Sequence, residues 1–230
     1  MLFSNHIPSL NSFMKQSQII DIQSPYADIS EVEREIGDND VVNKAINIAK
    51  EAVDFSQIKY VGIIGDSAVL GLASTEFNNS IIQNVFNELI QYKDNYEELS
   101  SADQQRLKDI EIKAEMLKNN NELIAFQVNP YNIVQQADDL LRNILIEMQN
   151  ENITSEEINK NEDQIRRDLT TVILASVLAH EGTHAKGGGE MMGEGGAQQA
   201  EKRVIENALG KGEYSYLSEF KTIEENLLNG

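Results

Sequence analysis

The spacing of apolar residues along the chain predicts more helix than strand. Residues 41–53 and 165–184 carry apolar side chains every three or four positions, the spacing that places them on one face of an α-helix. Residues 131–149 are expected to form a further helix. Leu123–Asn129 instead alternates apolar and polar side chains, which is typical of a β-strand. The chain therefore combines long helices with a small sheet.

Two further apolar runs, Tyr60–Gly65 and Val69–Ala73, are short and close together in the sequence. We expect them to form the two strands of a hairpin, with a glycine weakening each strand. Residues 77–121 are polar and helical in pattern, and they predict two antiparallel helices projecting as an insertion. The apolar positions of this insertion fit two interpretations: packing of its helices against each other, or docking on the body or a partner.

The predicted fold class is α+β, predominantly helical. Residues 1–39 have an irregular pattern with two prolines and predict an extended lead segment. Residues 40–230 predict one domain that includes the helical insertion at 77–121.

A five-residue motif ends the helix predicted at 165–184. It reads His180-Glu181-Gly182-Thr183-His184, and we expect the capping box at Thr154 and Glu157 to start this helix. Residues four apart lie on nearly the same face of a helix, so both imidazoles can reach one metal ion. Zinc suits such a site, and Glu181 lies close enough to hold a water without binding the metal. The alternative is that the histidines only lie at the end of a core helix and bind no metal.

Composition restricts the chemistry of the chain. Its net charge is -19, from 38 acidic and 19 basic residues, so nucleic acids and anionic membranes are not expected partners. There is no cysteine, so a metal must be bound through nitrogen and oxygen. Met1–Ile22 lacks the pattern of a secretory signal, and no run is long enough to cross a membrane. A cytoplasmic location is the default; a particle-borne protein or another secretion route stays open, as does the oligomeric state.

A catalytic zinc with two histidine ligands needs one more protein ligand, and Glu190, Glu194 and Glu201 are the candidates. The chain resembles the zincin metallopeptidases, and among them the gluzincins, whose third ligand is a glutamate on the next helix. Glu194-Gly195-Gly196-Ala197-Gln198 matches the gluzincin pattern around that glutamate, with Gln198 where many members carry aspartate. The metzincin motif fits less well, because Glu190 stands where its third histidine belongs.

The resemblance implies a small sheet packed on an active-site helix, followed by a glutamate helix. It also implies a zinc-dependent metallopeptidase, a hydrolase of peptides or proteins, with Zn²⁺ held by His180, His184 and Glu194. Glu181 would be the general base. Leu123–Asn129 resembles the edge strand that binds the substrate. Tyr214 and Tyr216 are candidates for stabilising the oxyanion, the alternative being ordinary packing at the C-terminal end. A second expected function is a catalytically inactive zincin-fold protein with a structural or interaction role, for example in a phage particle or toxin assembly.

Overall fold

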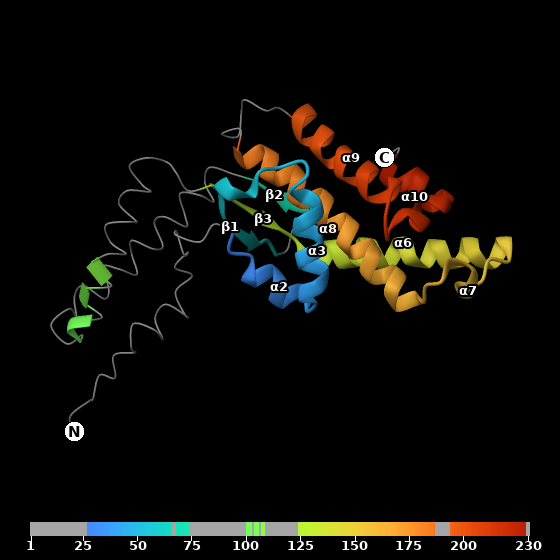
Figure 1. Cartoon of the computed structure of the whole chain (residues 1–230), viewed down its shortest axis with the longest axis horizontal. Coiled ribbons are helices and arrows are strands. Elements are labelled where there is room, and N and C mark those ends of the chain that lie inside the picture. The colour runs from blue at the N-terminus through green and yellow to red at the C-terminus, as the bar shows by residue number, and fades with distance from the viewer. Residues whose placement is uncertain are drawn as a thin grey trace, which may run out of the picture.

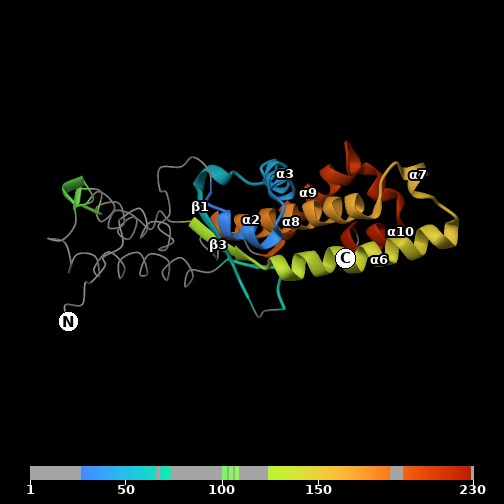
Figure 2. The same cartoon turned by 90° about the horizontal axis from the view of Figure 1, so that it is seen from below.

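One long helix, α8, lies at the centre of the fold (Figures 1 and 2). The structure is a computed structural model that describes residues 27–65, 68–73, 100–102, 104–105, 107–108, 124–186 and 194–228. Helix α8 (Glu162–Lys186) contacts α3 (Asn39–Ala49), α6 (Pro130–Glu151), α9 (Glu194–Gly210) and the sheet. Most of its residues are therefore buried.

Shorter elements complete the described part of the chain. Further helices are α2 (Ser30–Ile36), α7 (Ser155–Ile158) and α10 (Lys221–Ile223), single helical turns cover Phe55–Gln57, Ser215–Glu219 and Glu224–Leu228, and the described positions at 101–102, 104–105 and 107–108 are also helical. The strands are β1 (Ile58–Ile63), β2 (Gly71–Leu72) and β3 (Ile124–Val128). This confirms the α+β, mostly helical fold class. No helix among the described residues has both the length and the apolar character needed to span a membrane.

The boundaries of α7 and α8 correct the expected start of the motif helix. Thr154 and Glu157 do form a capping box, but it opens only the short helix α7. Asn159 ends α7 in the left-handed conformation, with φ of 52°. The side chain of Asn161 then accepts a hydrogen bond from the backbone N–H of Gln164 and opens α8. A second cap therefore begins the motif helix.

The strand order β1-β3-β2 differs from the expected hairpin. Strand β3 lies in the middle, parallel to β1 and antiparallel to β2. Its Phe126 and Val128 are fully buried, as befits a strand paired on both sides. Backbone bonds from Ile64 to Val128 and from Asn129 to Leu70 hold both ends of the β1–β2 connection against β3. The expectation that Leu123–Asn129 is the edge strand is therefore wrong; among the described strands, β2 occupies an edge.

The folded body begins before residue 40. Helix α2 lies inside the segment expected to be extended, and its Val32 is fully buried. The backbone of Asp28 bonds to residues 59 and 61, which attaches the start of α2 to β1. Residues 1–26 lie outside the described part of the chain. The same holds for the insertion at 77–121, apart from a few positions between 100 and 108.

Candidate metal centre

Three side chains from two helices converge at the end of α8. His180 and His184 project from successive turns of α8, and Glu194 is the first residue of α9. The Nε2 atoms of the histidines are 3.2 Å apart. Oxygens of the Glu194 carboxylate lie 3.6 Å from Nε2 of His180 and 3.4 Å from Nε2 of His184. One potential ligand atom from each residue thus borders a common point.

These separations are close in size to those between ligands of one tetrahedral zinc ion. Nitrogen and oxygen ligands about 2.0–2.2 Å from a tetrahedral zinc lie about 3.3–3.6 Å from one another. The two Nε2 atoms are 3.2 Å apart, and the histidines face different oxygens of Glu194: Oε1 lies 3.6 Å from Nε2 of His180, and Oε2 lies 3.4 Å from Nε2 of His184. The Glu194 side chain is 62% exposed, so the cluster is open to water on that side. Three protein ligands with one open position are typical of catalytic rather than structural zinc.

Glu201 orients the first histidine. It lies two turns after Glu194 on α9, and its carboxylate is 2.8 Å from Nδ1 of His180. This contact favours the tautomer in which Nδ1–H donates to Glu201 and the Nε2 lone pair faces the cluster. The same hydrogen bond is the main cause of a raised pKa of His180. Burial lowers this pKa, and the negative charges of Glu181, Glu201 and Glu194 raise it further.

Gln198 does not take the orienting role that aspartate has in many gluzincins. Its amide donates instead to Oε1 of Glu194 at 3.2 Å, and so steadies the carboxylate next to the histidines. Glu201, three residues further along α9, supplies the contact with His180. Of the three candidate third ligands, Glu194 therefore lies with both histidines, Glu201 lies behind His180, and Glu190 lies outside the described residues.

Glu181 points towards the sheet side of α8 and is buried, with 8% of its surface exposed. A Cβ placed on Gly71 would stand 2.5 Å from Cγ of Glu181, so β2 crosses directly over this side chain. The backbone N–H of Ala73 donates to the carboxylate. Burial raises the pKa of Glu181 to about 7, while the charge of His180 and the bond from Ala73 oppose the rise. Glu181 is thus poised to exchange a proton near neutral pH.

Two glycines that were not singled out from the sequence make this packing possible. A Cβ on Gly182 would stand 3.1 Å from Val53 and 3.2 Å from Ile58, so the chain around β1 approaches α8 at the middle of the motif. Gly71 likewise allows β2 to approach α8 closely. The available signal for Gly71 was a glycine within a strand pattern, which marks either a bulge or a close approach of backbone.

Neither candidate tyrosine lies at the metal centre. The hydroxyl of Tyr216 donates to Asp168 at 2.9 Å, and Asp168 precedes His180 by twelve residues, or about 18 Å along the helix. Tyr214 is buried in the apolar core of the same C-terminal segment. Their role in the described structure is packing, as in the alternative interpretation.

No family model, curated protein or solved structure matches the chain. The resemblance to gluzincins therefore depends on the residues from His180 to Glu201 and on the geometry described above.

Proposed function

We propose that the chain is a zinc-dependent metallopeptidase of the gluzincin type. The observation that carries the proposal is the cluster of His180, His184 and Glu194, in which one potential ligand atom from each residue lies within 4.8 Å of the others, with Glu181 adjacent on the same helix as the histidines. The strands of the sheet come first in the sequence, followed by α8 with the two histidines and then by α9 with Glu194. This is the order that the resemblance implies, and it supports a zincin-like arrangement.

The residues of this centre have distinct tasks. His180, His184 and Glu194 would hold the zinc, which supplies a Lewis acid that polarises a carbonyl and acidifies a water. Glu181 accepts the proton of the attacking water and returns it to the leaving amine. Glu201 fixes the ring of His180 and keeps its Nε2 directed into the cluster.

The arrangement of the sheet favours β2 as the strand that receives an extended peptide. Among the described residues β2 pairs with β3 alone, and Leu72 is exposed. Because Gly71 lies directly over Glu181, a peptide paired along β2 would pass close to the general base. The substrate class is therefore an extended peptide or a protein segment.

Metal analysis and peptide hydrolysis together test the proposal. We expect one zinc per chain, cleavage of a mixed-sequence peptide library detected by mass spectrometry, and loss of cleavage in Glu181→Gln with zinc retained. His184→Ala should lose zinc and activity together. Purified protein that binds no zinc at micromolar concentrations would refute the metallopeptidase proposal.

The burial of Glu181 favours a second candidate, a zincin-like protein that binds zinc but cleaves nothing. A general base must reach water, whereas this carboxylate is 8% exposed, lies beneath Gly71 and is bound by Ala73. In that case the zinc would brace α8 against α9 in a structural or interaction role. Full zinc occupancy without cleavage of any library peptide, in the wild-type protein as in Glu181→Gln, would select this candidate.

A further inference from the structure

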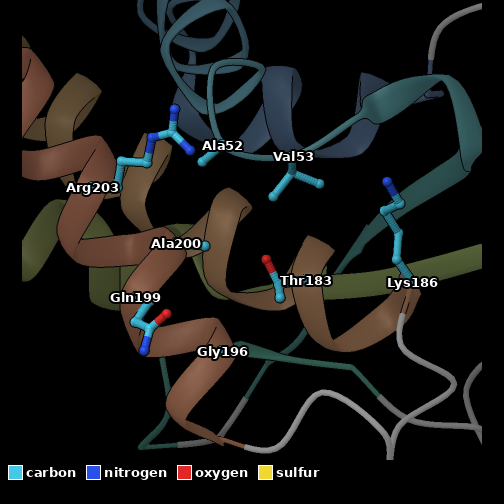
Figure 3. A pocket seen from close by; sticks show the side chains of 8 residues that line it. All are labelled: Ala52, Val53, Thr183, Lys186, Gly196, Gln199, Ala200 and Arg203. Atoms are coloured by element: carbon cyan, nitrogen blue, oxygen red, sulfur yellow. The ribbon is translucent and has the colours of Figure 1, made fainter.

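A cavity lies on the opposite side of the α8–α9 contact from the metal centre. It has a volume of about 600 Å³, is partly open to solvent and is bordered by the end of α8, the start of α9 and the residues that follow α3 (Figure 3). Arg203 lines this cavity, whereas Glu201 faces His180. Side chains two residues apart on a helix differ by about 200° in direction, so these two residues lie on nearly opposite faces of α9. The cavity and the metal centre therefore have separate walls.

Two cationic side chains flank this cavity in a chain with a net charge of -19. Figure 3 shows Arg203 of α9 and Lys186 of α8 on two sides, with Thr183 and Val53 between them. Arg203 makes no hydrogen bond or ion pair with any residue in the described part of the chain. The Nζ of Lys186 lies 3.9 Å from the Asp54 carboxylate, which is itself bound at 2.6 Å and 3.0 Å by Ser56. Among the residues that line the cavity, Lys186 and Arg203 are cationic and none is acidic.

The rest of the wall suits a ligand with an apolar part. Ala52, Val53 and Ala200 present only hydrocarbon. The hydroxyl of Thr183 already donates to the carbonyl of Ala179 at 2.7 Å, so it offers an oxygen acceptor rather than a free donor. The volume lies within the range of about 300–1,000 Å³ typical of small-molecule sites.

We propose that this cavity binds a small organic anion, a carboxylate or a phosphate ester that carries a compact apolar group. Arg203 holds the anionic group, Lys186 adds a second positive charge on the other side of the cavity, and the alanine and valine side chains contact the apolar group. Guanidinium pairs with the planar carboxylate or with phosphate through two parallel hydrogen bonds, whereas the ammonium supplies a single charge. The site does not depend on the zinc-dependent function proposed above, because it shares no wall residue with His180, His184 and Glu194.

Titrations with simple probes test the site. Phenylacetate and phenyl phosphate would be titrated into the full chain, with and without a chelator, and followed by calorimetry and by amide shifts in ¹⁵N-labelled protein. We expect saturable binding of at least one anion in both conditions, with shifted amides around Thr183, Gln199 and Arg203. Uncharged phenylacetamide should bind at least about tenfold more weakly, since the charged hydrogen bonds are lost. The two anions distinguish a carboxylate site from a phosphate site.

Arg203→Gln has a matched control one residue away. Lys202 loses the same charge in Lys202→Gln, but it is 63% exposed, pairs with Glu206 and does not line the cavity. Arg203→Gln should weaken anion binding about tenfold or more, with Lys202→Gln unchanged. Lys186→Gln gives a second readout of the same site. The proposal is overturned if neither anion binds, if phenylacetamide binds as well as phenylacetate, if Lys202→Gln weakens binding as much as Arg203→Gln, or if binding disappears with chelator.

Discussion

Replacing Glu181 by glutamine should stabilise the metal-free protein at alkaline pH. The pKa of Glu181 is raised by burial from 4.5 to about 7 in the folded protein. The folded state therefore holds this proton more tightly than the unfolded chain does. The resulting contribution to stability is complete below pH 4.5 and is lost as the pH rises through 7. Glutamine keeps the shape and the acceptor for Ala73 but has no charge to bury.

The size of the effect follows from the two pKa values. Each factor of ten in the acid constant corresponds to about 1.36 kcal/mol, so ionising Glu181 in the folded protein costs roughly 3 kcal/mol. At pH 9, Glu181→Gln should therefore unfold with a free energy about 3 kcal/mol higher than wild type. At pH 4.5 the difference should fall below about 0.5 kcal/mol, because the carboxyl group is then largely protonated in the folded protein and half protonated in the unfolded chain.

Urea unfolding followed by circular dichroism, in chelator and across pH 4.5 to 9, measures this difference directly. Glu206→Gln is the control: its carboxylate is 55% exposed and pairs with Lys202, so its stability should change by less than about 0.5 kcal/mol at either pH. The reasoning fails if Glu181→Gln gives no gain at pH 9. It fails equally if the gain is the same at both pH values, because the effect would then come from packing rather than from ionisation.

Three further outcomes are expected. Gly71→Ala should destabilise the protein by about 1–3 kcal/mol in urea unfolding, because the new Cβ would stand 2.5 Å from Cγ of Glu181, whereas Gly65→Ala has nothing within 4 Å and serves as its control. Glu201→Ala, which removes the acceptor for His180, should weaken zinc binding about 10- to 100-fold in a chelator competition assay, with Glu206→Ala close to wild type; equal affinities would exclude the orienting role. Removing zinc present at 100 times its dissociation constant should lower the free energy of unfolding by about 2.7 kcal/mol, and an unchanged value would contradict metal binding to the folded state.

Local patterns in the sequence predicted the elements that carry the candidate site. The spacing of apolar residues at 165–184 predicted α8, because the apolar face of that helix is continuous. The four-residue spacing of His180 and His184 fixed their common face without knowledge of the fold. Glu194 also begins a helix, as the gluzincin pattern implied, and its carboxylate lies beside both histidines.

Features that depend on long-range packing were not predictable in the same way. The strand order requires knowing that β3 pairs on both sides, and nothing local to Tyr60–Gly65 or Val69–Ala73 distinguishes a hairpin from two strands flanking a third. Likewise, Gln198 stands at the position where the gluzincin pattern places an aspartate, but Gln198 contacts Glu194, and Glu201 contacts His180 instead. Both differences arise from tertiary contacts between segments distant in sequence.

The geometry of the metal centre depends on how α9 packs, because the two histidines and Glu194 belong to different helices. His180 and His184 are fixed by α8, which is buried on nearly every side. Glu194 is held by α9, whose Ala197, Val204 and Leu209 lie in the interior. The contact of Glu201 with His180 also ties the two helices together, two turns along α9 from Glu194. A zinc ion would add a second link between the same helices, so metal binding and the packing of α9 on α8 should strengthen each other.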